Sequence, residues 1–170
     1  SEALQRLHKA GVSRLAMLTG DNAALAKEVA EEVGIDVCRA ELLPQDKLTH
    51  LQDIRKKRGS VLFVGDGIND APVLAGADVG AAMGSGADAA IEAADVVFMT
   101  SSVEAIPQSI EIAKNVGKIA IQNVVFALAI KFLVMILGLA GYANMWMAVF
   151  ADTGVAMLCV LNSIRILYRK

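Results

Sequence analysis

Apolar and polar residues alternate with two different periods along the chain, and the pattern changes near residue 118. In the first part, short apolar runs predict strands, and segments with apolar residues at helical spacing predict helices. The predicted strands are 12–18, 37–39, 60–64, 79–83 and 96–99, and the predicted helices are 2–10, 23–33, 44–58, 72–76 and 87–94. Strands that alternate with helices indicate an α/β fold with a parallel, doubly wound sheet and right-handed crossovers.

The second part consists of two long apolar segments. Residues 119–142 are 24 residues with one charge, and residues 145–164 are 20 residues with one charge. Each is long enough to cross the hydrocarbon core, which takes about 20 residues. Basic residues flank only the outer ends of the pair: Lys114, Lys118, Arg165, Arg169 and Lys170. The positive-inside rule therefore places both ends in the cytoplasm and the turn outside. A buried helical hairpin of a soluble protein is the alternative.

These patterns predict three parts. They are a soluble domain over 1–100, a linking helix over 101–118 starting after Ser101 or Ser102, and a transmembrane hairpin over 119–170, with spans at about 119–142 and 145–166.

Charge and cysteine content narrow the possible functions. Residues 1–118 hold 12 Lys and Arg against 17 Asp and Glu, a net charge of −5, whereas residues 119–170 hold 4 against 1, a net charge of +3. The acidic first part argues against a nucleic-acid surface. Cys38 and Cys159 are too few and too different in setting for a disulfide framework, so we expect a reducing compartment for the soluble part.

The strongest candidate for chemistry is Gly65-Asp66-Gly67-Ile68-Asn69-Asp70-Ala71-Pro72, directly after the predicted strand 60–64. Ligands bind at this edge of an open α/β sheet. Two carboxylates there suit Mg²⁺, which takes one or two carboxylates and shares its other positions between water and phosphate. A Gly/Asp/Asn turn without chemistry is the alternative.

Two further positions suit a phosphoryl group. Thr19-Gly20-Asp21-Asn22 lies between a predicted strand and a helix, where a hydroxyl and free N–H groups meet. The alternative is a simple helix N-cap. Lys47 lies in the first turn of a predicted helix, where a cation opposes the helix dipole at a cost of about 0.3–1 kcal/mol. A nearby anion would explain its position, although a surface lysine is the alternative.

Two charged residues interrupt the apolar segments. Counted from the turn at about 1.5 Å per residue, Lys131 and Asp152 lie roughly 17 and 14 Å deep, at one level near the membrane midplane. A single charge there costs at least about 2.5–3.5 kcal/mol, so we expect each to be paired or to line a polar pathway. A purely structural ion pair is the alternative.

The order and spacing of three motifs resemble the second half of the phosphorylation domain of a P-type ATPase. The motifs are Thr19-Gly20-Asp21-Asn22, Pro44-Gln45-Asp46-Lys47 and Gly65 to Pro72. That domain has a haloacid dehalogenase-like, Rossmann-like fold. The resemblance implies transfer of the γ-phosphoryl group of ATP to an aspartate, followed by hydrolysis, with Mg²⁺ as cofactor. The roles it implies are Thr19 and Gly20 holding the phosphoryl group, with Asp21 in the same catalytic motif, Lys47 neutralising its charge, Asp66 and Asp70 binding Mg²⁺, and Asn69 bracing the loop.

Lys131 and the run Ala151-Asp152-Thr153-Gly154 resemble the last two membrane helices of the zinc-, cadmium- and lead-exporting branch of that family. In this resemblance Asp152 binds the exported cation and Lys131 is a built-in counter-ion that helps to release it. The Asn-Tyr and Met-Ser positions expected of the copper-exporting branch are absent from these segments.

Several parts of such an ATPase are not in this sequence. It contains no DKTG phosphoacceptor loop and no TGE loop. We therefore expect a fragment that is inactive alone, with ATP bound mainly by other domains, in a protein of a bacterial plasma membrane. The other hypotheses are a membrane-anchored dehalogenase-like phosphatase, which would need an upstream nucleophilic Asp, and a non-catalytic membrane-interaction fragment.

Overall fold

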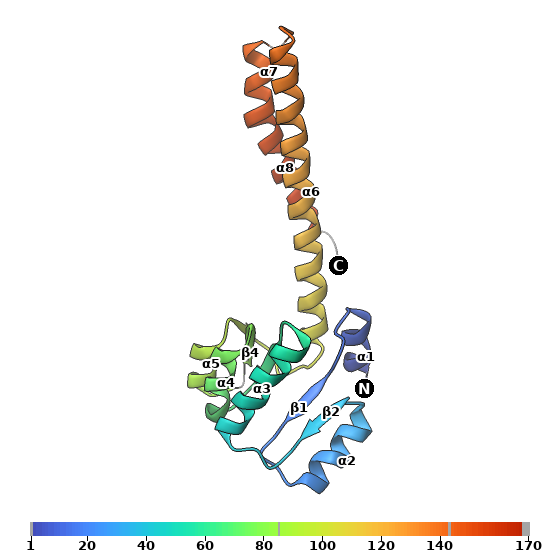
Figure 1. Cartoon of the computed structure of the whole chain (residues 1–170), viewed down its shortest axis with the longest axis vertical. Helices are drawn as coiled ribbons and strands as arrows, with labels where there is room; N and C mark the ends of the chain where they lie inside the picture. The colour runs from blue at the N-terminus through green and yellow to red at the C-terminus, as the bar shows by residue number, and fades with distance from the viewer. Residues whose placement is uncertain (1, 85, 143, 168–170) are drawn as a thin grey trace. The chain divides into compact units, whose positions relative to one another are not determined.

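The structure is a computed structural model that describes residues 2–84, 86–142 and 144–167. The chain divides into two compact units, Ser1–Gln108 and Ser109–Lys170. Strands and helices alternate along the first unit (Figure 1). Its elements are α1 (Glu2–Lys9), β1 (Ala16–Leu18), α2 (Ala23–Val33), β2 (Val37–Arg39), α3 (Pro44–Arg58), β3 (Leu62–Gly65), the 3-10 turn η1 (Ile68–Asp70), α4 (Ala71–Gly76), β4 (Val79–Met83), α5 (Asp88–Ala93) and β5 (Val96–Phe98).

The strands pair in parallel but form two separate groups. β1 pairs with β2, and β3, β4 and β5 pair in chain order. The sequence predicted parallel strands and an α/β domain, which the structure confirms, but it predicted one sheet. Among the described residues, β1 and β3 each pair on one side only. Each therefore leaves one row of backbone N–H and C=O groups open to a further strand.

Local signals fix the ends of the helices next to the candidate site. The Asn22 side chain accepts a hydrogen bond from the N–H of Ala24 at 2.8 Å, and Gly34 ends α2 with a left-handed φ of 84°. Both match the sequence prediction and the usual chemistry of helix caps. α3 begins at Pro44, and the Asp46 carboxylate accepts a hydrogen bond from the N–H of Leu43 at 3.1 Å.

A small apolar core holds α4 and α5 against β4. Leu74, Ala82 and Ala90 are fully buried, and Phe63 and Ile91 pack around them. α4 approaches β4 so closely that a Cβ on Gly80 would lie 2.5 Å from the Leu74 carbonyl oxygen. This close packing positions η1, which leads directly into α4, at the end of β3.

The second unit is helical. It contains most of α6 (Ala105–Leu139), then α7 (Met145–Val149), a π turn η2 (Phe150–Gly154) and α8 (Val155–Ile164). α6 starts after a turn in which the Ser102 hydroxyl accepts a hydrogen bond from the N–H of Glu104. It ends three residues before the predicted end of the span, because Gly141 adopts a φ of 80° and the N–H of Tyr142 bonds to the Leu137 carbonyl. The second helical run ends at Ile164, followed by a turn, two residues before the predicted end at 166.

Both helical runs, Ala105–Leu139 and Met145–Ile164, are long and apolar enough to cross a membrane, and their most apolar 18-residue windows have mean hydropathies of 2.2 and 1.7. Only 6% and 11% of their most apolar windows are buried by the chain itself. Helices of a soluble core would be mostly buried, so this exposure favours the membrane hairpin over the soluble alternative.

Candidate functional site

The loop that follows β3 is packed tightly around Asp70. Gly65 is buried at the end of the strand, and a Cβ on it would lie 2.8 Å from the Asp70 Cβ. Any side chain at residue 65 would therefore push Asp70 aside. The glycine is required here for close approach, since its φ is not in the left-handed region.

Lys47 and Asp70 form an ion pair. Lys47, from the first turn of α3, places its Nζ 2.8 Å from the Asp70 Oδ1, and the two side chains are only 14% and 13% exposed. The carboxylate is thus the anion that compensates for the unfavourable position of this lysine relative to the helix dipole. The structure brings together these two predicted site residues, which lie 23 positions apart.

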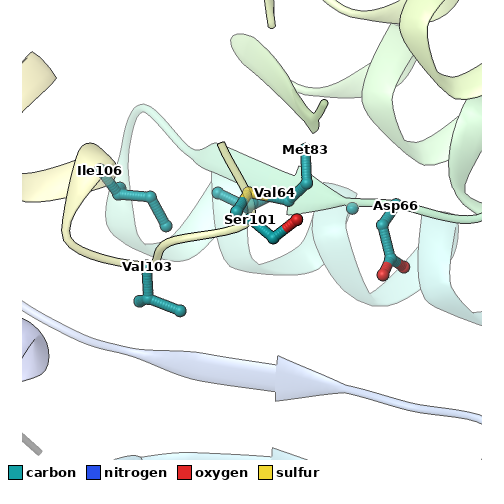
Figure 2. A pocket seen from close by; sticks show the side chains of 7 residues that line it. Val64, Asp66, Met83, Ser101, Val103 and Ile106 are labelled. Atoms are coloured by element: carbon teal, nitrogen blue, oxygen red, sulfur yellow. The ribbon is translucent and has the colours of Figure 1, made fainter. Parts of the chain in front are cut away.

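Asp66 lies just beyond β3 and lines a cavity of about 360 Å³ (Figure 2). Its carboxylate is at one end of the labelled group, and Val103 and Ile106 are at the other. The backbone is held in place because the N–H of Ala87 donates to the Asp66 carbonyl at 3.0 Å. Among the described residues, none bonds to the Asp66 carboxylate, which leaves both oxygens available to a ligand.

The turn after β1 is closed on itself. The Thr19 hydroxyl donates to the Asp21 carboxylate at 2.7 Å and accepts from the Asp21 N–H at 3.1 Å. Asn22 caps α2, so Asp21 is free to make these contacts. A Cβ on Gly20 would lie 3.3 Å from the Leu42 carbonyl oxygen. Within the described chain, no hydrogen bond or ion pair joins this turn to Lys47, Asp66 or Asp70, and the exposed Asn69 side chain has no partner.

The second unit contains the other predicted pair. The Lys131 Nζ lies 3.1 Å from the Asp152 Oδ1, with the side chains 56% and 77% exposed. Asp152 is in the middle of the π turn η2, a distortion that is frequent at functional sites. Among the described residues, no group of three or more His, Cys, Asp or Glu side chains is placed to hold a metal ion. Within the described residues, the pair therefore offers a cation one carboxylate, that of Asp152.

One polar cluster in this unit was not predicted from the sequence. Asn123 on α6 bonds to residues of α8, including Asn162 and Ser163. The available signal was the presence of amide side chains inside two otherwise apolar spans, which is uncommon enough to indicate contacts between helices.

Known proteins resemble the chain over both of its units. Residues 1–78 match the haloacid dehalogenase-like hydrolase family. The chain is 48% identical over 168 residues to a zinc-transporting ATPase of Synechocystis sp., with 97% of this chain and 23% of that protein covered. It is 46% identical over 174 residues to a cadmium, zinc and cobalt-transporting ATPase of Bacillus subtilis, with 100% and 25% covered.

Solved structures give the same result. The crystal structure of a zinc-transporting PIB-type ATPase in the E2·Pi state matches with a TM-score of 0.91 at 36% identity, covering 98% of this chain and 27% of that one. The chain thus spans about a quarter of the length of the relatives that it matches. Over its whole length the chain is a homologue of one segment of the zinc- and cadmium-transporting P-type ATPases, and its first unit has a haloacid dehalogenase-like fold.

Proposed function

We propose that this chain is part of an ATP-driven exporter of divalent heavy-metal cations that works through an aspartyl-phosphate intermediate. Zinc and cadmium, which the relatives' names give as cargo, are the first candidates, and lead is a further one. Residues 1–100 would belong to the phosphorylation domain, and 119–170 would cross the membrane. Residues 101–118 would form the helix that links the two parts, with residues 1–118 in the cytoplasm. The observation that carries this proposal is the Lys131–Asp152 pair within two apolar helices, on the same chain as the Lys47–Asp70 pair.

The reaction balances as two phosphoryl transfers. The γ-phosphoryl group of ATP passes to an aspartate carboxylate and ADP leaves, after which water cleaves the acyl phosphate and regenerates the carboxylate. Positioned cations and hydrogen-bond donors provide most of the catalysis in such transfers. The acceptor aspartate and the nucleotide site would come from the remaining domains of the protein, since this sequence has no DKTG loop.

The first unit has donors that fit a magnesium ion. Mg²⁺ binds through one or two carboxylates and keeps waters and phosphate oxygens as its other ligands. Asp66 offers an unpaired carboxylate beside a cavity, and Asp70 uses only its Oδ1 for Lys47. We assign these two residues to Mg²⁺, which when bound supplies positive charge next to the phosphoryl oxygens.

The neighbouring residues would act on the phosphoryl group itself. In this proposal Lys47 neutralises its oxygens, and Thr19 and Gly20 donate hydrogen bonds to them. The Thr19 hydroxyl is held by Asp21, so a phosphoryl oxygen has to replace the Asp21 carboxylate as its acceptor. Asn69 would brace the loop against parts of the protein outside this chain.

The open edges of β1 and β3 leave room for a further strand between them. β1 carries the Thr19 turn and β3 carries the Asp66 loop, and each has one unpaired edge among the described residues. Leu62, Val79 and Val96 on the strands are also still exposed. We infer that a strand from the remaining phosphorylation domain pairs with these edges and brings the acceptor aspartate between the two loops.

The membrane pair would bind and release the cargo. Asp152 attracts a divalent cation, and the Lys131 ammonium 3.1 Å away weakens that attraction enough for release. Both side chains are largely uncovered by this chain, and a charge facing lipid is costly. Other membrane helices of the full-length protein would therefore cover the pair, while the outer faces of the hairpin contact lipid.

Replacing Asp152 in the full-length protein tests this function. The Asp152→Ala and Asp152→Asn variants should lose zinc-stimulated ATP hydrolysis in purified, lipid-reconstituted protein, because no carboxylate remains to hold the cation. The control is Met157→Leu, an exposed apolar residue on α8, which should keep wild-type stimulation. Zinc stimulation that survives in Asp152→Asn would remove Asp152 from the transport site.

A further inference from the structure

Four side chains of the second unit form a closed hydrogen-bonded cluster between α6 and α8. This cluster, here called the amide clasp, consists of Asn123, Cys159, Asn162 and Ser163. The Asn123 Nδ2 donates to the Cys159 carbonyl at 3.1 Å and is 2.9 Å from the Ser163 Oγ, and the Asn162 Nδ2 donates to the Asn123 Oδ1 at 2.8 Å. The Ser163 hydroxyl donates to the Cys159 carbonyl at 2.9 Å, and the Cys159 thiol lies 3.6 Å from the Asn123 carbonyl oxygen.

All the hydrogen-bonding groups of the Asn123 side chain have partners inside the amide clasp. A primary amide has two N–H donors and one acceptor oxygen, and for Asn123 each has a partner on α8. An amide saturated in this way holds its neighbours in place and has no free donor left for a ligand. In a bilayer such bonds specify which helix faces meet, because apolar side chains contact lipid as readily as they contact one another.

The clasp and the Lys131–Asp152 pair are on one seam between the helices. Asn123 precedes Lys131 by eight residues on α6, from 123 to 131. Its partners follow Asp152 by seven to eleven residues, from 152 to 159 and 163. At about 1.5 Å per residue, both helices therefore advance by on the order of 12 Å between the two contacts. A slide of α8 along α6 that opens the clasp would also separate the Lys131 ammonium from the Asp152 carboxylate.

The helix geometry around Asp152 does not by itself fix the direction of its carboxylate, so the contact made by the amide clasp is important. Asp152 lies in the π turn Phe150–Gly154, in which the N–H of Val155 bonds to the carbonyls of Asp152 and Phe150. A π turn changes the facing of the residues on either side of it, so the turn alone does not determine which way the carboxylate points. The clasp fixes the helix that continues from this turn.

We propose that Asn123 is a positioning residue of the transport site. Through the amide clasp it holds α8 in register with α6, keeps the Lys131 ammonium beside the Asp152 carboxylate, and so sets how tightly that carboxylate binds the transported divalent cation. This inference rests on the proposed role of Asp152.

The test measures zinc-stimulated ATP hydrolysis against free zinc in the purified full-length protein. The Asn123→Leu variant removes the three side-chain bonds at similar volume, and Gln122→Leu is the matched control, an exposed amide on the same helix. With the counter-ion displaced, Asn123→Leu should lower the half-saturating zinc concentration about threefold or more and slow turnover, and Lys131→Met, which removes the counter-ion outright, should do the same. Coupled residues show non-additive effects, so adding Asn123→Leu to Lys131→Met should change the half-saturating zinc no further.

The opposite results would overturn the inference. A purely structural clasp would reduce the yield of folded protein or the maximal rate while leaving half-saturating zinc as in Gln122→Leu, and its effect would add to that of Lys131→Met. If Asn123→Leu does not fold, Ser163→Ala, which removes one bond from Asn123, should give the same shift at smaller size, and no shift would count against the clasp. Failure of the proposed function is distinguished by Asp152→Asn, which would then retain zinc dependence whatever Asn123→Leu does.

Discussion

Two ion pairs of the first unit differ in how far they are removed from water. Lys47 and Asp70 are 14% and 13% exposed, whereas Arg55 and Asp78, whose charged atoms are 2.6 Å apart, are 52% and 23% exposed. Exposed pairs contribute about 0–1 kcal/mol because water and salt screen them. Leaving a mostly buried carboxylate without its partner costs more free energy of folding. Substitution of Lys47 should therefore destabilise the unit more than the same substitution of Arg55.

The Lys47→Met variant should be destabilised by about 1–3 kcal/mol, since Asp70 is left without a partner. Magnesium should restore part of that loss if Asp66 and Asp70 bind it, because the ion replaces the missing positive charge. Thermal unfolding of the full chain in detergent, with and without Mg²⁺, measures both effects. In Arg55→Met the loss should be below about 1 kcal/mol, and magnesium should stabilise this variant no more than it stabilises wild type. Equal magnesium responses in the two variants would contradict the assignment.

Neighbouring elements pack more tightly at the end of β3 than in the loop that follows. A Cβ on Gly65 would lie 2.8 Å from the Asp70 Cβ, while on Gly67 the nearest atom would be the Asp70 Oδ2 at 3.6 Å, an ordinary contact. Gly65→Ala should therefore displace η1 from β3 and destabilise the unit by about 1–3 kcal/mol, and Gly67→Ala should stay within about 0.5 kcal/mol of wild type.

Chemical denaturation of the full chain compares these two glycines directly. In the full-length protein, Gly65→Ala should also lower phosphoenzyme formation, because Asp70 no longer lies where the Lys47 ammonium meets it. Similar stabilities for Gly65→Ala and Gly67→Ala would show that the strand end can move without cost.

The sequence predicted elements well where the signals are local. Asn22 and Gly34 bound α2 at the predicted residues because capping depends on those side chains and that backbone conformation. β1 was predicted over 12–18 but covers only Ala16–Leu18, since a ladder extends only as far as its partner, and β2 has three residues. The end of α6 was placed too late because the left-handed Gly141 was not treated as a stop signal.

The candidate site was predictable in composition and less so in contacts. Motifs identified Lys47 and Asp70 separately, but their ion pair depends on how α3 packs beside the β3 loop, which spacing does not give. The hydrogen bond between the Thr19 hydroxyl and the Asp21 carboxylate was also not predictable, because the motif allows several local hydrogen-bond partners. Lys131 and Asp152 were placed at one depth because a helix has a fixed rise, whereas Asn123 requires knowledge of which helix faces meet.

The chain as a unit is chemically incomplete for the proposed reaction. It spans 23% and 25% of two relatives, and its strands leave open edges and exposed apolar side chains. The exposed Lys131–Asp152 pair is similarly uncovered. The open strand edges are in the first unit and the uncovered ion pair is in the second. The remaining protein would therefore have to complete both the phosphoryl site and the cation site.

This incompleteness makes a prediction for residues 1–170 purified alone. They should not hydrolyse ATP or incorporate phosphate from γ-labelled ATP, because the sequence lacks a DKTG acceptor. The full-length protein under the same magnesium and zinc conditions is the positive control and should form a phosphoenzyme, whereas its Asp152→Asn variant should lose the zinc dependence. Stable labelling of the isolated chain would mean that a carboxylate among its own residues accepts the phosphoryl group. If that labelling were lost in Asp66→Asn, Asp66 would be the nucleophile, and its assignment to magnesium would be wrong.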